Sequence, residues 1–191
     1  MEEMKNPGLD SIETNFKVRS FDARISYEEY QRLPKNPLHI ILDNLRSAFN
    51  VGSIFRLCDS LRVRGLFLCG STAFPPHVKL EKTSMGTVGY VPWTRFERTA
   101  EAVLYLKKRK IPVWAVETTS LSKPYTDVSY PRELGIVLGN EALGINREVL
   151  SLCDAFIEIP MLGFKNSINV AAACAVIGYW FFQTQKKPFH P

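Results

Sequence analysis

A strand, an apolar loop and a helix follow one another in the stretch Ile159-Pro160-Met161-Leu162-Gly163-Phe164-Lys165-Asn166-Ser167-Ile168-Asn169-Val170-Ala171-Ala172-Ala173. Pro160 ends the strand, because proline has no N–H to donate to a neighbouring strand. We expect Ser167 to cap the helix, whose small first residues leave room for another backbone segment to pack closely. Asn169 is a mediocre helix former with no evident structural reason to lie in the first turn, so it is a candidate for chemistry. The alternative is an ordinary capped core helix.

Outward from this stretch, short apolar runs alternate with amphipathic runs between residues 38 and 182. The runs expected to be strands are 38–43, 65–69, 91–96, 111–117, 134–138 and 155–159. The runs with helical periodicity are 50–61, 99–110, 146–153 and 167–182. This alternation predicts an α/β domain with a mainly parallel sheet of about six strands.

Polar segments flank this domain on both sides. Residues 1–37 form an N-terminal extension in which Ser26 and Glu29 have the spacing of a helix capping box, and residues 183–191 form a basic C-terminal tail. The extension lacks the apolar stretch of a signal peptide, and the longest apolar run, residues 170–182, is too short to span a bilayer. We therefore expect a cytoplasmic protein without a membrane partner.

The composition excludes several classes of protein. The chain has 191 residues, of which 46% are hydrophobic and 23% charged, which is typical of a globular domain and not of a disordered chain or a coiled coil. A net charge of +5 hints at an anionic partner without establishing one. The four cysteines lie apart in apolar runs without metal-ligand spacing, so we expect four buried, reduced thiols and no metal. The sequence also lacks the glycine-rich signatures of Rossmann and P-loop nucleotide sites.

The segment 43–56 joins an expected strand to an expected helix. Loops of this kind bind ligands in open α/β sheets. If Asn50 is the N-cap, its side chain folds over the first turn while Arg56 projects from the second. The alternative is that Asn50 is only a cap and that Arg56 is only a solvated cation.

The segment 135–145 is an apolar strand followed by a loop in which Glu141 lies between Gly139 and Gly144. Glycine permits positive φ and a close approach of a ligand to the backbone. A carboxylate placed there could orient a partner or accept a hydrogen bond. The alternative is an ordinary turn with a solvated glutamate.

Taken together, the three segments resemble the SpoU (TrmH-like) family of the SPOUT class of RNA 2′-O-ribose methyltransferases. The family's motif Asn-x-Gly-x-x-x-Arg matches residues 50–56, and its motif Gly-x-Glu-x-x-Gly-(Ile/Val) matches residues 139–145. Its third motif matches residues 159–170, with Ile168 where leucine is usual. A shorter Lys-x-Ser-x-Gly-(Ala/Thr) segment matches residues 82–87, so the resemblance covers residues 38–182.

The resemblance implies a parallel sheet with helices on both faces and a C-terminal trefoil knot. It also implies methyl transfer from S-adenosylmethionine to a ribose 2′-hydroxyl of structured RNA, by a homodimer with its active site at the subunit interface. The larger members that act on rRNA carry an RNA-binding domain, for which residues 1–37 are too short, and this favours tRNA. The alternatives are an rRNA 2′-O-methyltransferase, a non-catalytic RNA-binding homologue of the same fold, and a SPOUT enzyme that methylates a base.

The resemblance also assigns the site residues. Its catalytic set is Arg56, Asn50, Glu141, Ser167 and Asn169. Since a guanidinium stays protonated in proteins, we expect Arg56 to clamp the adjacent phosphate and stabilise the developing alkoxide, while the other four position it and the ribose. The cofactor-binding residues that it implies are Thr118, Leu138, Gly139, Asn140, Gly144, Ile159, Met161, Ser167, Ile168 and Asn169.

The positive charge is unevenly distributed along the sequence. Residues 46–110 include 12 basic and 4 acidic residues, whereas residues 111–185 include 4 basic and 7 acidic residues. This division is expected if phosphates dock on the first half and a cationic sulfonium lies in the second. The expected RNA-binding residues are Arg46, Arg62, Arg64, Lys82 and Lys165.

Overall fold

The computed structural model describes residues 23–185, so residues 1–22 of the predicted extension and residues 186–191 of the predicted tail lie outside the described residues. The chain divides into two compact units, Met1–Arg32 and Leu33–Pro191. In the first unit, helix α2 (Tyr27–Arg32) begins with the predicted capping box. The Ser26 N–H donates to Glu29 Oε2 at 2.8 Å, and the Glu29 N–H donates to Ser26 Oγ at 3.2 Å.

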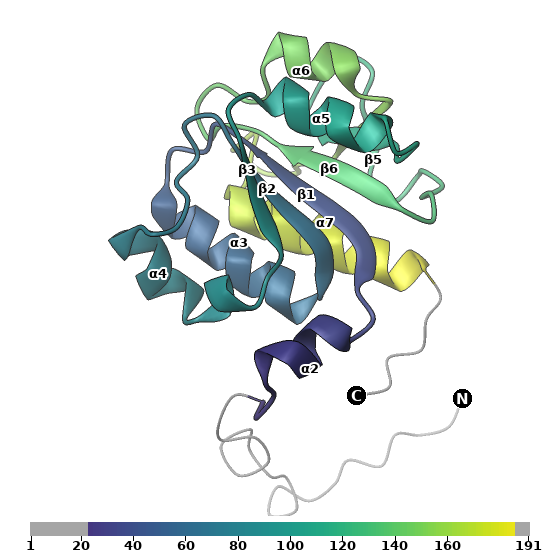
Figure 1. The fold of residues 1–191 in the computed structure, drawn as a ribbon. Helices are drawn as coiled ribbons and strands as arrows, with labels where there is room; N and C mark the ends of the chain where they lie inside the picture. Colours follow the sequence, from purple (N-terminus) through teal and green to yellow (C-terminus); the bar gives the residue numbers. More distant parts are fainter. Residues whose placement is uncertain (1–22, 186–191) are drawn as a thin grey trace, which may run out of the picture. The chain divides into compact units, whose positions relative to one another are not determined.

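The second unit is built on a sheet of seven parallel strands in the spatial order β3-β2-β1-β6-β4-β7-β5 (Figure 1). The strands are β1 (Asn36–Asp43), β2 (Val63–Cys69), β3 (Trp93–Phe96), β4 (Val113–Val116), β5 (Lys123–Pro124), β6 (Leu134–Leu138) and β7 (Ala155–Glu158). Six of them match the predicted strands. The additional strand, β5, has two residues and no apolar run, so no sequence pattern indicated it.

The helices of this unit are α3 (Ala48–Ser60), α4 (Val78–Ser84), α5 (Thr99–Lys107), α6 (Arg147–Leu152) and α7 (Val170–Thr184), with a 3-10 turn, η2, at Thr87–Gly89. Neither α4 nor η2 was predicted. No helix within residues 23–185 has both the length and the apolar character needed to cross a membrane. The four cysteines are free thiols, and Cys58, Cys69 and Cys174 are buried as expected. Cys153 was also expected to be buried but is only half-buried, because it follows the end of α6.

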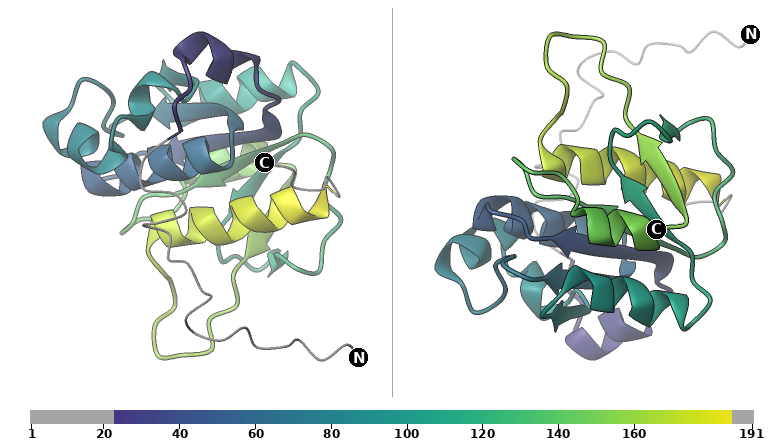
Figure 2. Two further views of the ribbon diagram at one scale, coloured as in Figure 1. Left: turned by 90° about the horizontal axis from the view of Figure 1, so that it is seen from below. Right: turned by 90° about the horizontal axis from the view of Figure 1, so that it is seen from above.

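Strand β1 explains why helices cover both faces of the sheet. Leu38, Ile40 and Leu42 belong to a core shared with α3 and α7, whereas Ile41 belongs to a second core shared with α5 and α6. Successive side chains of a strand point to opposite faces, so a strand buried on both sides is apolar at nearly every position. Figures 1 and 2 show α3 and α7 on one face and α5 and α6 on the other, as the resemblance implies.

Two helices begin at other residues than predicted. Ser47 caps α3 by accepting the Asn50 N–H at 3.3 Å, so Asn50 is not the cap but lies in the first turn. Asn169 rather than Ser167 caps α7, and its Oδ1 accepts the N–H groups two and three residues further on, at 2.9 and 3.4 Å. The prediction that Asn169 has no structural role is therefore wrong: it satisfies N–H groups that the helix itself leaves free.

The parallel pairing gives the sheet two distinct edges: the strands begin at one, which we call the amino edge, and end at the other, the carboxyl edge. The three motif segments follow β1, β6 and β7, so they meet at the carboxyl edge. Figure 2 shows the loop between β7 and α7 (residues 159–169) extending away from the sheet. The C-terminal trefoil knot stays a prediction.

Candidate active site

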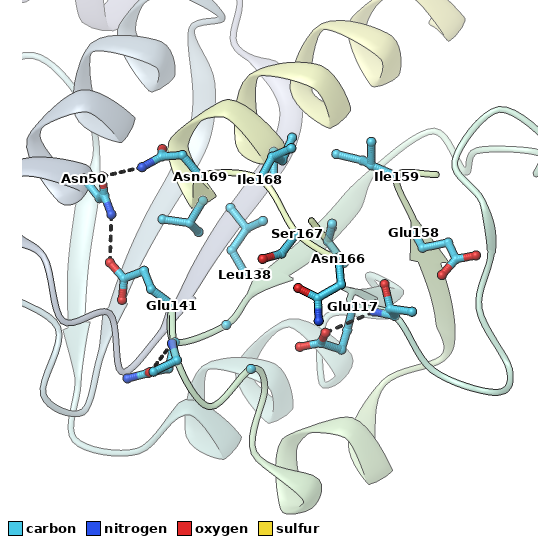
Figure 3. Close-up of a pocket in the computed structure, with 18 of the residues that line it drawn as sticks. Asn50, Glu117, Leu138, Glu141, Glu158, Ile159, Asn166, Ser167, Ile168 and Asn169 are labelled. Atoms are coloured by element: carbon cyan, nitrogen blue, oxygen red, sulfur yellow. Dashed lines mark hydrogen bonds between the residues drawn. The ribbon is translucent and has the colours of Figure 1, made fainter. Parts of the chain in front are cut away.

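A cleft of about 1180 Å³ opens at the carboxyl edge, where the loops after β1, β4, β6 and β7 meet (Figure 3). All the predicted cofactor-binding residues line it: Thr118, Leu138, Gly139, Asn140, Gly144, Ile159, Met161, Ser167, Ile168 and Asn169. A second cavity of about 380 Å³ follows the loop after β7 and shares several lining residues with the cleft. Residues that are far apart in the sequence therefore surround a single hollow.

A chain of side-chain hydrogen bonds joins the three motif segments at this cleft (Figure 3). Asn169 Nδ2 donates to Asn50 Oδ1 at 3.0 Å, and Asn50 Nδ2 donates to Glu141 Oε1 at 2.8 Å. Glu141 also accepts the backbone N–H groups of Arg46 at 2.8 Å and Ser47 at 3.2 Å. These bonds hold the start of α3, the loop after β6 and the start of α7 in one geometry.

The same bonds keep the Glu141 carboxyl ionised. Partial burial raises its pKa, but the hydrogen bonds from the Arg46 N–H, the Asn50 side chain and the Ser47 N–H outweigh burial, so the pKa lies below its ordinary value. A carboxylate with three donors and a lowered pKa is a poor proton acceptor at neutral pH. Its contacts suit it to hold Asn50 and the start of α3 in place.

Buried polar contacts at the end of β1 anchor the loop after β6. Asp43 is almost fully buried, and its Oδ2 accepts the Asn146 N–H at 2.9 Å while its Oδ1 accepts from Thr99 Oγ1 at 2.5 Å. Asn140 Nδ2 donates to the backbone oxygen of Asn44 at 2.7 Å. Burying a carboxylate is costly unless hydrogen bonds compensate it, so loss of these contacts would destabilise the whole edge.

Two glycines allow this loop to fold tightly on itself. Gly144 has a φ of +69°, a conformation that favours glycine, and its N–H and C=O bond to the backbone of Asn140. A Cβ on Gly139 would lie 2.5 Å from the carbonyl carbon of Gly144 and 2.6 Å from the nitrogen of Ile145. The Ile145 N–H also donates to Glu117 Oε2 at 3.0 Å, which ties the loop to the end of β4. The close approach at Gly139 is thus made by the protein's own backbone.

The structure brings four of the five predicted catalytic residues to the cleft, where Asn50, Glu141, Ser167 and Asn169 line it. Arg56 is exposed on α3 and lines neither cavity, and it forms no ion pair within the described part of the chain. Six residues of α-helix correspond to a rotation of about 240°, so Asn50 and Arg56 project in different directions.

The predicted RNA-binding residues fall in separate places. Arg46 and Lys165 line the cleft, and the Lys165 ammonium lies 5.6 Å from the centroid of the Phe164 ring. Arg62 and Arg64 lie at the start of β2, on the amino edge, and Lys82 lies on α4 outside both cavities. The two halves of the sequence therefore do not correspond to two surfaces of the protein.

Two carboxylates that were not predicted from the sequence also line the cleft. Glu117 follows β4 and Glu158 ends β7, so both lie at the carboxyl edge. Their position at strand ends is the signal that could have identified them, because ligands of parallel sheets bind at that edge. With Glu141 they outnumber Arg46 and Lys165, the two cations of the lining.

Comparisons with known proteins identify the family. The SpoU rRNA Methylase family matches residues 37–179. The chain is 31% identical over 171 residues to the tRNA (guanosine(18)-2′-O)-methyltransferase of Thermus thermophilus, a match that covers 90% of this chain and 86% of that protein. Most of each protein is therefore included in the comparison.

Solved structures show the same fold. The SpoU methyltransferase AviRb from Streptomyces viridochromogenes, in complex with the cofactor AdoMet, has a TM-score of 0.73 at 25% identity; the match covers 80% of this chain and 59% of AviRb. The TrmH/SpoU tRNA modifying enzyme of A. aeolicus has a TM-score of 0.75 at 24% identity, covering 84% of this chain and 81% of that one. On the family match and the Thermus relative, this chain belongs to the SpoU rRNA methylase family.

Proposed function

We propose that this protein transfers a methyl group from S-adenosylmethionine to a ribose 2′-hydroxyl of tRNA. The observation that carries the proposal is the cleft in which the hydrogen bonds from Asn169 to Asn50 and from Asn50 to Glu141 unite the three motif segments. The Thermus relative is named for 2′-O-methylation of a tRNA guanosine, and the AviRb structure contains AdoMet. Both names support the same reaction class.

The lining of the cleft suits this cofactor. Leu138, Ile159 and Ile168 offer apolar walls on which an adenine ring is favoured. Glu117 and Glu158 add carboxylates, which favour the cationic sulfonium and ammonium groups of S-adenosylmethionine. We expect the main chain of the segments after β6 and β7 to hold the edges of the adenine through hydrogen bonds.

When bound, the cofactor supplies an electrophilic methyl group on a sulfonium sulfur. The protein must then hold the ribose oxygen in line with that methyl group, and such alignment can lower the barrier by about 7–11 kcal/mol. Asn50 and Asn169 have fixed amide groups at the cleft and would orient the ribose. Glu141 would act as a positioning residue through Asn50, because its lowered pKa makes it a poor base. The hydroxyl proton would pass to water or to a neighbouring polar group.

We expect Arg56 to act in the cleft of a second protomer. Within its own chain it is exposed on α3 and lines neither cavity. In a homodimer, which the family resemblance implies, Arg56 of one protomer could lie at the cleft of its partner. There its guanidinium would clamp the phosphate beside the target ribose and stabilise the developing alkoxide. The trefoil knot, with α7 passing through a loop, forms part of the same proposal.

The reaction is tested by incubating the purified protein with unfractionated tRNA and S-adenosylmethionine and then analysing the nucleosides by mass spectrometry. We expect a 2′-O-methylated nucleoside that is absent when the protein is omitted. A methylated base would contradict ribose transfer, and methylation of rRNA but not tRNA would contradict the substrate. If the protein binds RNA but neither binds S-adenosylmethionine nor transfers a methyl group, the result would favour a non-catalytic RNA-binding homologue.

The position of Arg56 is tested by mixing two impaired variants, Arg56→Ala and Asn169→Ala. If Arg56 serves the partner's cleft, each mixed dimer of twofold symmetry contains one intact site, and a random mixture regains about a quarter of the wild-type activity. If Arg56 serves its own cleft, no mixed dimer has an intact site and the activity stays lost. Size-exclusion chromatography of each variant checks that dimers form.

A further inference from the structure

Basic side chains gather at the amino edge of the sheet, opposite the cleft. The segments just before the six longer strands hold six basic and two acidic residues; these segments are 33–35, 61–62, 90–92, 108–112, 131–133 and 153–154. The loops just after those strands hold three basic and three acidic residues; these loops are 44–47, 70–77, 97–98, 117–122, 139–146 and 159–169. Asp43 and Glu158, the last residues of β1 and β7, add two more carboxylates to the carboxyl edge. The positive surplus therefore lies away from the cleft.

Other basic side chains already pair with the acidic residues of the amino edge. Glu133 Oε1 lies 2.6 Å from Arg64 Nη1, and Asp154 Oδ1 lies 2.8 Å from Lys107 Nζ, and both partners lie outside the counted segments. Five cations of the amino edge form no ion pair with any residue between 23 and 185: Arg62, Lys108, Arg109, Lys110 and Arg132. Their charge is uncompensated at this surface.

The pairing of the strands makes these cations neighbours. The segment before β2 bonds to the start of β1, where the Asn36 N–H donates to Arg62 O at 2.8 Å. The segment before β4 bonds to the start of β6, where the Gly135 N–H donates to Pro112 O at 2.9 Å. Because β1 and β6 are adjacent, the cations form one row across the four strands β2, β1, β6 and β4.

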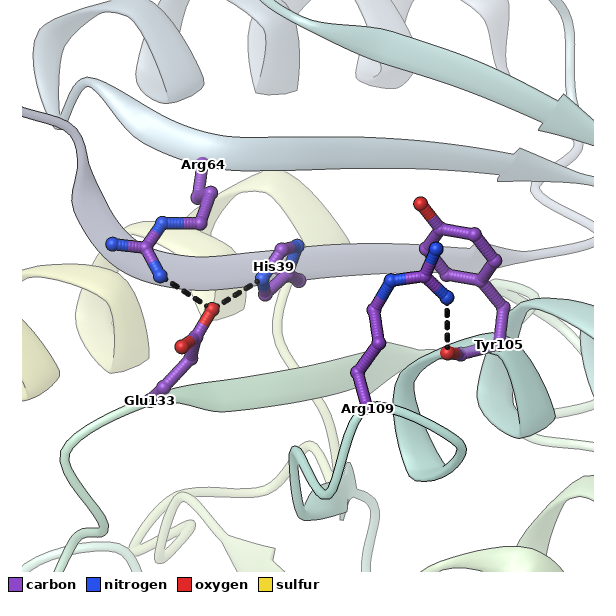
Figure 4. A network of polar contacts seen from close by, with 5 residues as sticks. All are labelled: His39, Arg64, Tyr105, Arg109 and Glu133. Atoms are coloured by element: carbon purple, nitrogen blue, oxygen red, sulfur yellow. Dashed lines mark hydrogen bonds and ion pairs between the residues drawn. The ribbon is translucent and has the colours of Figure 1, made fainter.

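Arg109 is already held in a fixed position within this row. Figure 4 shows its guanidinium against Tyr105, with the guanidinium carbon 3.6 Å from the ring centroid and Nη1 donating to the backbone oxygen at 3.0 Å. Tyr105 itself is 38% exposed to solvent. A preorganised guanidinium loses less conformational freedom when it binds a phosphate, so Arg109 is suited to contact one.

We propose that the amino edge is a second RNA-contact surface, which binds phosphates of a folded RNA at a distance from the nucleotide that is methylated. The identity of the polyanion rests on the proposed function. Strand β1 has 8 residues, so the two edges lie about 25 Å apart and the RNA must extend past both. A row of cations across four strands matches the line of charges in a phosphate backbone better than it matches one small anion.

The test compares two triple variants of the full chain. Lys108→Gln, Lys110→Gln and Arg132→Gln remove three charges from the amino edge, whereas Lys79→Gln, Lys123→Gln and Arg147→Gln remove three exposed charges that lie elsewhere and line neither cavity. Binding of unfractionated tRNA, without S-adenosylmethionine, is measured by filter binding over a series of salt concentrations. Thermal unfolding of each variant confirms that it is folded.

We expect the amino-edge variant to bind tRNA at least about tenfold more weakly at low salt, with the slope of log affinity against log salt reduced by about 2. The control variant should bind like the wild type. Equal weakening in both variants, or none in the amino-edge variant, would overturn the proposal. Hydrogen exchange of the wild-type protein should also show protection of residues 108–112 and 131–133 when tRNA is added. These measurements require no methyl transfer. A negative result would therefore overturn the second RNA-contact surface without affecting the proposed reaction, and a failure of methyl transfer would leave the test of the surface valid.

Discussion

Asn169 has two roles, and one side-chain amide performs both. Its oxygen caps α7, and its nitrogen donates to Asn50 in the cleft. An amide can do this because it carries an acceptor and a donor on one planar group. The start of α7 is thus coupled to the proposed catalytic geometry through a single residue.

Replacing Asn169 should separate these roles. Serine caps helices as well as asparagine does, so Asn169→Ser should unfold at nearly the wild-type denaturant concentration. Its shorter side chain lacks the amide nitrogen that donates to Asn50, so we expect methyl transfer to tRNA to fall about tenfold or more, a change of about 1.4 kcal/mol in the barrier. Asn169→Ala should lose activity and also about 1 kcal/mol of stability. Urea unfolding and kcat are the measurements, and an unstable serine variant would contradict the capping role.

The loop after β6 is the element whose shape depends most on glycine. A Cβ on Gly139 would meet backbone atoms at 2.5 and 2.6 Å, which cannot move without opening the loop. Gly89, at the end of η2, lines neither cavity and has no atom within 4 Å of the corresponding position. The two glycines therefore form a matched pair for substitution.

We expect Gly139→Ala to weaken S-adenosylmethionine binding by about tenfold or more and to lower the unfolding temperature, because strain of this kind costs about 1–3 kcal/mol. Gly89→Ala should leave both unchanged within error. Isothermal titration and thermal unfolding measure the two quantities. Wild-type binding by Gly139→Ala would show that the turn after β6 does not shape the cofactor site.

The amino end of β1 contains a buried imidazole. His39 Nε2 lies 3.0 Å from Glu133 Oε1 (Figure 4). The centroid of the Phe67 ring lies 5.7 Å from the centroid of the His39 ring. Burial lowers the pKa of His39 below its ordinary value; Glu133 opposes this shift, and the positive charges of Arg64 and Arg109 reinforce it. Burial raises the pKa of Glu133, but its bonds to His39 and Arg64 lower it more.

Acidification should therefore destabilise this part of the sheet in two stages. The unfolded chain binds a proton at His39 as the pH falls through about 6.5, before the folded chain does, so the free energy of unfolding decreases from pH 7 towards pH 5. Glu133 adds a second loss as the pH falls below about 4.5, since its folded-state pKa is lowered. His39→Gln cannot titrate and should flatten the first stage only. Urea unfolding at a series of pH values tests this, and an unchanged first stage would contradict it.

On the scale of the whole sheet, the charges at its two edges suit two different ligands, S-adenosylmethionine in the cleft and RNA at the amino edge. The cleft lining has three carboxylates and two cations, whereas the uncompensated cations lie at the amino edge. Raising the salt concentration from about 50 to 200 mM should weaken tRNA binding by tenfold or more, because bound counterions are released. Binding of S-adenosylmethionine in the partly enclosed cleft should change by less than about twofold. Similar salt dependence for both ligands would contradict this separation.

Local patterns predicted most of the elements of the second unit. The predicted strand 134–138 coincides with β6, because its apolar run ends sharply at glycine on the carboxyl side. The helix starts were less certain, since Ser47 and Asn50, or Ser167 and Asn169, are all residues that favour N-caps. Only the three-dimensional path of the chain decides which member of each pair has its oxygen over the first turn.

The sequence by itself determined the α/β alternation, the three motifs, the family and the expected cofactor-binding residues, because each depends on a short pattern placed after a strand. The tertiary structure alone decided that Glu117 and Glu158 join the cleft and that Arg56 lies outside it in its own chain. It also decided that Arg62 and Arg64, only a few residues beyond Arg56 in the sequence, lie at the amino edge, which is the edge away from the cleft. The physical reason is that each helix carries the chain back across the sheet, so the edge that a residue occupies depends on strand pairing and not on distance along the sequence.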